Sequence, residues 1–471
     1  MTTEGKARIA IIGAGFSGSL LAVQLLRRFL PGSRIYLIDK NTKFGCGLAY
    51  STGNPNHLLN VRASRMSAFA DEPEHFLKWL RGYTDANGPL DTDGQGADTF
   101  VPRHLYGTYI QELLGNEIWQ RGNGRNLYLV PDEAVAIRQR SRSLSVEVRG
   151  GRRYEVDAAV LAIGNFPHDD AAGHYYGNPW RPQALADLDP ESPVLLIGTG
   201  LTMVDTVISL LDQAYRGPIY AVSRRGLLPR RHGEAPPHRL PELSRIDTSS
   251  VVALLQLVRK QVQERGDEAE VWRSVVDALR PHTQRIWQGL SSAQKRRFLR
   301  HLRPWWDVHR HRMAPKVADA IDRAIRSRQL SVWAARVQSM APDRHGVSVA
   351  LRRRGSDQLE TLRVARVIDC SGPQCDYGRI DSVLVQDLLA QGMARPDPLK
   401  LGLDVTAESA LVNRWGVPSR CIFALGPVTR GHFWEITSVP DIREQCWQVA
   451  ARIEERLVAP AEEKLAAGAA R

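Results

Sequence analysis

The fold is decided by the stretch Arg8-Ile9-Ala10-Ile11-Ile12-Gly13-Ala14-Gly15-Phe16-Ser17-Gly18. It opens with a short apolar run typical of a buried strand, and the residues after Gly18 carry leucine and valine at helical spacing. A second apolar strand is predicted over residues 34–38, and Asp39 follows it, 21 residues after Gly18. Strand, glycine loop, helix, strand and acid therefore arrive in the order of a complete βαβ unit.

The glycine loop of this unit predicts a binding site for a dinucleotide. Gly13 permits a tight turn, Gly15 lets the backbone approach a pyrophosphate, and Gly18 allows the helix to pack closely on the strand. Phe16 and Ser17 begin the helix, whose free amides and positive dipole end face the phosphates. The carboxylate that ends the second strand can accept hydrogen bonds from the ribose of an adenosine.

A second glycine loop follows later in the chain. The apolar strand predicted over residues 194–197 leads into Gly198-Thr199-Gly200-Leu201-Thr202-Met203, in which a methionine replaces the third glycine. The next strand ends in Ser223-Arg224-Arg225 rather than in an acid. These two arginines can bind a 2′-phosphate, which a carboxylate would repel, so the loop and its arginines predict an NADPH site. The alternative is that both arginines are only surface charges.

Three more apolar strands end in turns: residues 160–167 turn at Gly164, residues 367–373 at Gly372, and residues 421–427 at Gly426. Two dinucleotide units in one chain predict one flavin and one nicotinamide cofactor, FAD and NADPH or NADH. The order of motifs resembles the FAD- and NAD(P)-binding oxidoreductases with two dinucleotide folds, which include N-hydroxylating and Baeyer–Villiger monooxygenases. Pro427 stands where that family usually has Asp, which puts a side-chain contact to the flavin ribityl chain in doubt.

Five further segments resemble a bacterial subgroup of FAD/NAD(P)-binding proteins that includes flavin-dependent urate hydroxylases. They are residues 45–52, 57–61, 66–69, 101–107 and 303–312. The resemblance covers about residues 8–450. Together with a small sheet expected near the adenine, it implies further FAD contacts at Gly47, Met66, Val135, Gly164, Gly426 and Asp441.

The composition is that of an ordinary globular protein. With 43% hydrophobic and 24% charged residues, the chain can bury a core, which excludes wholesale disorder. No apolar stretch approaches the roughly 20 residues that a membrane helix needs. Five cysteines in 471 residues form no disulfide framework, so we expect a soluble protein of the reducing cytoplasm.

The motifs divide the chain into two interleaved domains. Residues 1–190 and 373–471 are expected to form the FAD-binding domain, and residues 191–372 the NAD(P)H-binding domain. A helical insertion is predicted at about 236–330, where tryptophan, leucine and valine recur at helical spacing. The predicted fold class is therefore α/β, with two Rossmann-like domains and a helical insertion.

Positive charge is concentrated in one segment. Residues 223–316 hold 20 Lys and Arg but only 9 Asp and Glu, a surplus that nearly equals the net charge of +12 of the whole chain. Such a segment attracts an anionic ligand, a nucleic acid or a membrane surface, or is simply a solvated helical face. Because nucleic-acid-binding signatures are absent from the sequence, we expect a small-molecule substrate and O2 as partners, with no nucleic acid and no membrane. The oligomeric state stays open.

Two other constellations have structural interpretations. Cys370 and Cys375 are separated by four residues, but they lie far from the positions of known redox pairs in two-dinucleotide reductases, which favours structural cysteines. His309 and His311 have no Cys or carboxylate at ligand spacing, so we expect no metal.

The cofactors are expected to perform the chemistry. In flavin monooxygenases NADPH reduces the flavin, O2 adds at C4a, and the hydroperoxide oxygenates the substrate. We therefore expect an FAD-dependent, NAD(P)H-consuming monooxygenase acting on a small anion, first of all urate, which would become 5-hydroxyisourate. Arg310 and Arg312 are candidates for binding the anion, Trp305 or Trp306 for stacking on it, and Trp434 is a further catalytic candidate. The alternatives are an NAD(P)H-dependent flavoprotein reductase and a non-enzymatic flavin-bound protein with a basic face.

Overall fold

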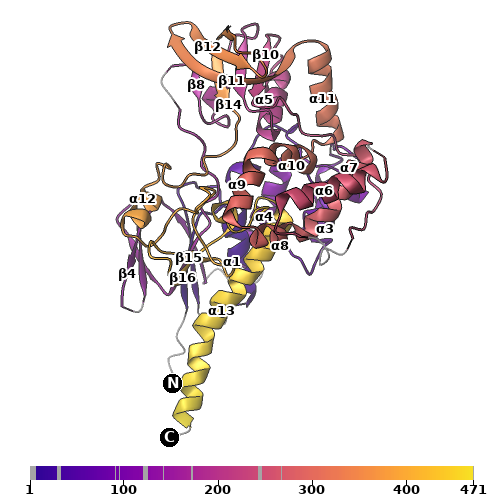
Figure 1. The fold of residues 1–471 in the computed structure, drawn as a ribbon. Coiled ribbons are helices and arrows are strands. Elements are labelled where there is room, and N and C mark those ends of the chain that lie inside the picture. Colours follow the sequence, from indigo (N-terminus) through magenta and orange to yellow (C-terminus); the bar gives the residue numbers. More distant parts are fainter. Residues whose placement is uncertain are drawn as a thin grey trace.

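Figure 1 shows the computed structural model of the chain, which has two lobes with a group of helices beside the place where they meet. Each lobe is built on its own sheet, and one long helix projects from the lower lobe (Figure 1). The structure describes residues 7–28, 33–90, 92–94, 96–119, 126–141, 143–170, 173–241, 247–266 and 268–469.

The lower lobe contains a six-stranded sheet in which five strands run parallel. Its strands, in sheet order, are β15 (Ala410–Val412), β16 (Pro418–Ala424), β7 (Ala158–Leu161), β1 (Arg8–Ile12), β2 (Arg34–Asp39) and β3 (Leu127–Pro131). Alternate side chains of β1 enter two different cores, Ile9 and Ile11 on one face and Ala10 and Ile12 on the other. Both faces of the strand are buried, as is usual for a parallel sheet.

Different elements cover the two faces of this sheet. The core on one face is shared with α1 (Phe16–Arg28), α4 (Arg103–Trp119) and α13 (Val439–Ala469). The core on the other face is shared with α12 (Val383–Ala390) and a separate antiparallel sheet. That sheet consists of β4 (Ala134–Gln139), β5 (Leu144–Val148) and β6 (Arg153–Val156). Carboxyl-terminal elements therefore complete the amino-terminal domain.

The upper lobe contains a seven-stranded mixed sheet. Its strands, in sheet order, are β13 (Leu359–Val364), β12 (Gly346–Arg353), β11 (Leu330–Asp343), β10 (Ile219–Ser223), β9 (Val194–Ile197), β14 (Arg366–Asp369) and β8 (Tyr175–Tyr176). The five strands from β11 to β8 are parallel to their neighbours, and β12 and β13 add an antiparallel edge. The predicted α/β class with two dinucleotide folds is confirmed.

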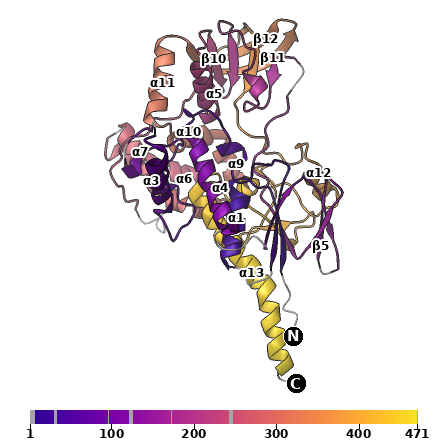
Figure 2. The ribbon, with the colours of Figure 1, turned by 180° about the vertical axis from the view of Figure 1, so that it is seen from behind.

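The inserted helices lie to one side of both lobes, as both views show (Figures 1 and 2). They are α6 (Val251–Gln263), α7 (Ala269–Leu279), α8 (Thr283–Gly289), α9 (Ser292–His301) and α10 (Arg303–Arg310). The predicted insertion also included α11 (Pro315–Arg326), but α11 shares the core of the upper lobe with α5 (Leu201–Asp212). It is thus a layer helix of the second dinucleotide domain.

The domain boundary near residue 190 also differs from the prediction. Tyr175 and Tyr176 form β8, which pairs with β14 of the upper sheet. The chain therefore enters the upper lobe before residue 175. A two-residue strand carries no periodicity of its own, so this pairing could not be read from the sequence.

The remaining described helices are short or connect the larger elements. They are α2 (Gly47–Tyr50), α3 (His75–Asn87) and the 3-10 turns Ala63–Arg65, Gly96–Asp98, Pro182–Ala184, Arg280–His282 and Gly426–Thr429. Among the helices that the structure describes, none combines the length and the apolar character needed to cross a membrane.

Buried polar contacts join the two lobes at α5. Arg103 forms an ion pair with Asp205 at 2.8 Å, and their side chains are 15% and 8% exposed. Nε2 of His57 lies 3.0 Å from the carbonyl oxygen of Asp205. His57 and Arg103 belong to two of the segments singled out in the sequence, 57–61 and 101–107, so these segments connect the domains.

Replacing Arg103 with methionine should lower the free energy of unfolding by about 3–5 kcal/mol, because Asp205 would stay buried without its counter-ion. Urea unfolding measures this loss. The matched control is Arg181→Met, since Arg181 pairs with Asp170 at 2.6 Å but is 58% exposed and should lose at most about 1 kcal/mol. Similar small losses in both variants would contradict the structural role of the buried pair.

Candidate functional site

The first glycine loop joins the end of β1 to α1, beside the end of β7. Gly13 has a φ of +103°, and a Cβ atom on it would lie 2.2 Å from the carbonyl oxygen of Ala162. A Cβ atom on Gly18 would lie 1.9 Å from the carbonyl oxygen of Gly13. Packing of the loop against its own domain therefore requires these two glycines.

Gly15 has a different environment. A Cβ atom on Gly15 would lie 3.3 Å from Cα of Gly47, and one on Gly47 would lie 2.9 Å from Cα of Gly15. The amide of Gly45 donates to the carbonyl of Ala14 at 2.8 Å, which fixes this second segment against the loop. Two stretches of bare backbone thus face each other at the amino end of α1. This cradle fits the pyrophosphate of a dinucleotide, because helix amides there lack intrahelical acceptors.

Asp39 lies at the carboxyl end of β2, directly beside the loop. Its Oδ2 accepts a hydrogen bond from the amide of Ala14 at 2.7 Å, and its Oδ1 accepts one from the amide of Asn41 at 2.8 Å. A carboxylate has about four acceptor sites, so Asp39 can still accept a ribose hydroxyl. The sequence prediction for Asp39 did not include its hydrogen bond to the loop.

The late turn at Gly426 meets the start of α1. Gly426 has a φ of +77°, and a Cβ atom on it would lie 2.7 Å from Oγ of Ser17. Its amide donates to Oε1 of the buried Gln445 at 2.8 Å. Gly164 has a φ of +67°, and a Cβ atom on it would meet nothing within 4 Å. The structure thus joins Ser17 and Gly426, two predicted FAD residues far apart in sequence.

The other predicted FAD residues belong to separate elements. Met66 is buried in the same core as Phe16. Val135 lies half-buried in β4, and Asp441 lies in the first turn of α13. Burial raises the pKa of Asp441 above its usual value, although Ser438 donates a hydrogen bond to it.

The second glycine loop repeats the geometry of the first. Gly198 has a φ of +108°, and a Cβ atom on it would lie 2.4 Å from the carbonyl oxygen of Cys370, at the end of β14. This is the relation that Gly13 has to Ala162 at the end of β7. Gly200 caps α5, and a Cβ atom on it would meet nothing within 4 Å. Met203, at the place of the third glycine, is fully buried in the core of the lobe.

The two arginines after β10 are not equivalent. Arg224 is exposed. Arg225 is half-buried, donates to the carbonyl of His301 at 3.3 Å, and has its guanidinium 5.9 Å from the ring centre of Trp305. The geometry therefore favours Arg224 as the residue that can reach a 2′-phosphate.

The change Arg224→Ala should raise the KM for NADPH about tenfold or more and leave the KM for NADH unchanged, since one charge-assisted hydrogen bond is worth about 1.5–3 kcal/mol. Arg225→Ala should have a smaller effect because its guanidinium already has a carbonyl partner. Steady-state kinetics with both nucleotides measure the ratio of the KM for NADPH to the KM for NADH. Arg216→Ala, another exposed arginine of this lobe, is the control. If the double change Arg224→Ala, Arg225→Ala left the ratio unaltered, these residues would not be the 2′-phosphate site.

The predicted anion-binding arginines already have partners. Arg312 forms a two-pronged ion pair with Asp277, with both nitrogen–oxygen distances 2.9 Å, and its side chain is 5% exposed. Nε of Arg310 lies 2.9 Å from Oε2 of Glu435, and both side chains are less than a tenth exposed. Sequence reasoning did not identify Asp277 and Glu435, because both contacts depend on how the helices fold together.

Glu435 is the centre of a buried polar group between the inserted helices and the lower lobe. Its Oε1 also accepts a hydrogen bond from Nε1 of Trp306 at 2.8 Å. Although burial opposes ionisation, the positive charge of Arg310 holds the pKa of Glu435 below its usual value. Burial and the charge of Arg310 lower the pKa of neighbouring Arg280 to about 10.

Trp434 fixes the inserted helices to the lower lobe. Its ring stacks on that of Trp287 in α8, with centroids 4.7 Å apart and 28° between the planes. The guanidinium of Arg430 lies 4.7 Å from the centre of the same ring. Trp434 is 3% exposed, so it packs as a core residue of this contact.

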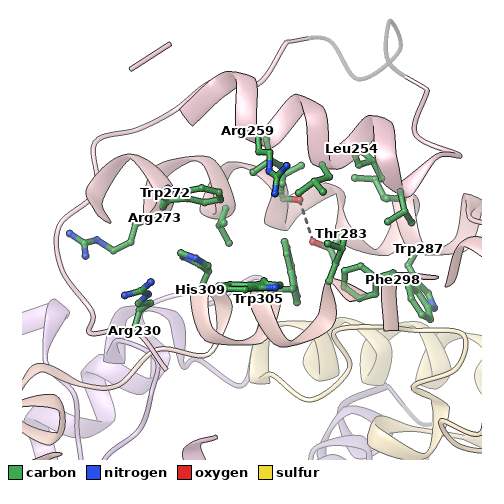
Figure 3. Close-up of a pocket in the computed structure, with 18 of the residues that line it drawn as sticks. Arg230, Leu254, Arg259, Trp272, Arg273, Thr283, Trp287, Phe298, Trp305 and His309 are labelled. Atoms are coloured by element: carbon green, nitrogen blue, oxygen red, sulfur yellow. Dashed lines mark hydrogen bonds between the residues drawn. The ribbon is translucent and has the colours of Figure 1, made fainter. Parts of the chain in front are cut away.

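A large cavity lies among the inserted helices (Figure 3). Its volume is about 820 Å³, and its walls come from α6 to α10 and from the segment before them. The sequence predicted that Trp305 or Trp306 stacks on an anionic substrate. Both line the cavity, and Trp305 is 43% exposed. Such exposure depends on tertiary packing, and helical spacing alone does not reveal it.

All five cysteines are unpaired in the structure. Cys370 is buried, and burial raises its pKa to about 12, which disfavours the reactive thiolate. Sγ of Cys375 donates to the carbonyl of Pro373 at 3.4 Å. Cys370 therefore lacks the low-pKa environment of a redox centre.

Part of the sequence matches a known protein family. Residues 10–166 match a family model described as FAD-NAD(P)-binding. No curated protein matches the sequence.

Solved structures match almost the whole chain. Ornithine hydroxylase (PvdA) from Pseudomonas aeruginosa has a TM-score of 0.64 at 14% identity, covering 96% of this chain and 99% of that one. The ornithine N-hydroxylase KtzI from Kutzneria sp. 744, solved with reduced FAD, NADP+ and L-ornithine, has a TM-score of 0.62 at 15% identity, with the same coverage. The bacillithiol disulfide reductase Bdr (YpdA) from Staphylococcus aureus has a TM-score of 0.53 at 10% identity, again covering 96% and 99%. Residues 10–166 are therefore similar to an FAD-NAD(P)-binding domain, as the first glycine loop predicts, and the chain has the two-domain fold of these hydroxylases and this reductase.

Proposed function

We propose that the protein is an FAD-dependent, NADPH-consuming monooxygenase of a small molecule. The observation that carries the proposal is the repeated loop geometry. Gly13 packs against Ala162 and Gly198 packs against Cys370 in the same way, and Gly200 leaves open backbone at the start of α5, which supports a dinucleotide site at each loop. One loop suits FAD and the other suits NADPH.

The chain's own residues bind and orient the cofactors. The Gly15–Gly47 cradle and the first turn of α1 would hold the pyrophosphate of FAD, and Asp39 its ribose. Gly200 at the start of α5 and Arg224 after β10 would hold NADPH. When bound, FAD accepts a hydride and activates O2. The inserted helices exclude water by packing on the lower lobe through Trp287 and Trp434.

The fold occurs in hydroxylases and in a disulfide reductase, so the choice between them depends on this chain's residues. A disulfide reductase needs an accessible, easily ionised dithiol. Cys370 is buried with a raised pKa, and Cys375 bonds to a carbonyl two residues away. The cysteines thus support oxygenation over disulfide reduction.

The charge of the region favours an anionic substrate. The segment 223–316 carries a surplus of positive charge, which would repel a diamine and attract an anion. Urate, the substrate expected from the subgroup resemblance, is the first anion to test. Arg310 and Arg312 are already paired, so we propose that they position Glu435 and the inserted helices and do not contact urate directly.

The test is to incubate the FAD-loaded protein with NADPH, urate and isotopically labelled O2, and to follow NADPH consumption and label in the product by mass spectrometry. We expect NADPH oxidation to accelerate with substrate and one labelled oxygen atom to enter the product. NADPH consumption with urate intact and peroxide formed would exclude urate and leave other anions to be screened in the same way. Turnover only with a disulfide or quinone, with no labelled product, would contradict the oxygenase proposal.

A further inference from the structure

The cavity among the inserted helices has an apolar interior. Its middle and one end are lined by side chains such as Leu254, Val258, Leu290, Phe298 and Leu302. Figure 3 shows Trp287 and Phe298 at this end, next to the lower lobe. The size falls within the range of cavities that enclose most of a drug-sized ligand.

The other end of the cavity is positively charged. Figure 3 shows Arg230 and Arg273 there, beside His309, and shows Arg259 on the upper wall near the middle of the cavity. Arg273 lies 3.6 Å from Glu270. Arg230 and Arg259 are exposed and form no ion pair with a carboxylate among the residues that the structure describes. The described residues that line the cavity include four arginines and neither Asp nor Glu.

His309 adds no positive charge near neutral pH. Its ring stacks on Trp272, with centroids 5.1 Å apart and 24° between the planes. Burial and the charges of Arg230 and Arg312 lower its pKa to about 4. The arginines are thus the cations of this end, and the stacked rings continue the apolar wall up to them.

We propose that this cavity binds an amphipathic anion, a medium-length acyl chain that ends in a carboxylate. The tail would lie along Leu254, Leu290 and Phe298, and the carboxylate would meet Arg230 and Arg259. Charge complementarity excludes an amphipathic cation, and the apolar interior excludes a nucleotide or a sugar phosphate.

The proposed site is separate from the two glycine loops. Trp287 stacks on Trp434, and Trp306 bonds to Glu435, so a packed layer lies between the cavity and the lower lobe. The inference does not rest on the proposed oxygenase function, because binding is measured without NADPH. A failure to bind the acid would therefore leave the proposed oxygenase function standing, and a failure of that function would leave the proposed binding site standing.

The test is calorimetric titration of the full-length, FAD-loaded protein with octanoate, decanoate and dodecanoate below their micellar concentrations. We expect one site per chain and about fourfold tighter binding for each added methylene. Dodecan-1-ol should bind at least about tenfold more weakly than dodecanoate, and dodecyltrimethylammonium should not bind. Equal binding of the three head groups, or no dependence on chain length, would overturn the proposal.

Variants of exposed residues locate the ligand without disturbing the fold. Arg230→Gln and Arg259→Gln should each weaken dodecanoate binding about tenfold and leave dodecan-1-ol unaffected. Lys260→Gln, an exposed cation beside Arg259 that does not line the cavity, is the matched control. Leu254→Trp should block both ligands by filling the cavity, whereas Val252→Trp on the exposed face of the same helix should not. If both arginine variants bound dodecanoate like the control, the cavity would not be the site.

Discussion

Replacing Gly15 with valine should give a folded protein that no longer holds FAD. A Cβ atom at this position would lie 3.3 Å from Cα and 3.9 Å from the amide nitrogen of Gly47, so the domain can accommodate the change if the backbone of Gly47 shifts slightly. The branched methyl groups, however, would stand beside this contact at the amino end of α1, where a pyrophosphate would lie. Loss of two charge-assisted hydrogen bonds weakens binding by about a hundredfold or more. Flavin absorbance per protein measures FAD content, and the thermal unfolding curve measures separately whether the protein is folded.

Two other glycine changes serve as controls for this result. Gly13→Val should unfold the domain, because the backbone there has a φ of +103° and the side chain would collide with Ala162. Gly82→Val in α3 has free space and should change neither folding nor FAD content. Full flavin occupancy in the folded Gly15→Val protein would place the FAD site elsewhere.

Replacing Gly200 with valine should have the complementary effect: FAD is retained and NADPH binding is lost. The backbone of Gly200 is extended, with a φ of −87° and a ψ of −168°, which valine adopts readily, and its Cβ atom would meet nothing within 4 Å. The side chain would then occupy the approach to the first turn of α5. We expect the KM for NADPH to rise about a hundredfold or more, by the same reasoning as for Gly15.

The opposite effects expected for Gly15→Val and Gly200→Val distinguish the FAD loop from the NADPH loop. Stopped-flow reduction of the bound flavin by NADPH should be lost in Gly200→Val and retained in Gly82→Val. A Gly200→Val protein that lost FAD and still bound NADPH would exchange the roles assigned to the two loops.

Local sequence was sufficient to predict the dinucleotide loops. The strand, glycine and helix periodicities of β1, α1 and β9 are short-range signals, so residues 8–39 and 194–203 could be interpreted from the sequence alone. The structure adds the reason for each glycine: Gly13 and Gly198 are required by the backbone that follows β7 and β14, Gly15 packs against Gly47, and a Cβ atom on Gly200 would meet nothing within 4 Å.

Long-range partners could not be predicted. Arg310 and Arg312 carried the right charge for an anion site, but Glu435 and Asp277 lie 125 and 35 residues away in sequence and neutralise them only after the helices fold together. The cavity depends in the same way on which faces of α6 to α10 turn toward one another. Helical periodicity shows that a face is apolar, but not whether a protein core or a ligand covers it.

We expect the two glycine loops of this chain to hold FAD and NADPH so that the nucleotide reduces the flavin. The most direct measurement is an anaerobic titration of the purified, FAD-loaded protein with NADPH, followed by flavin absorbance. We expect complete bleaching at one equivalent of NADPH per FAD, a much weaker response to NADH, and recovery of the oxidised spectrum when air is admitted. Flavin that stays oxidised with excess NADPH would show that the two loops do not work together.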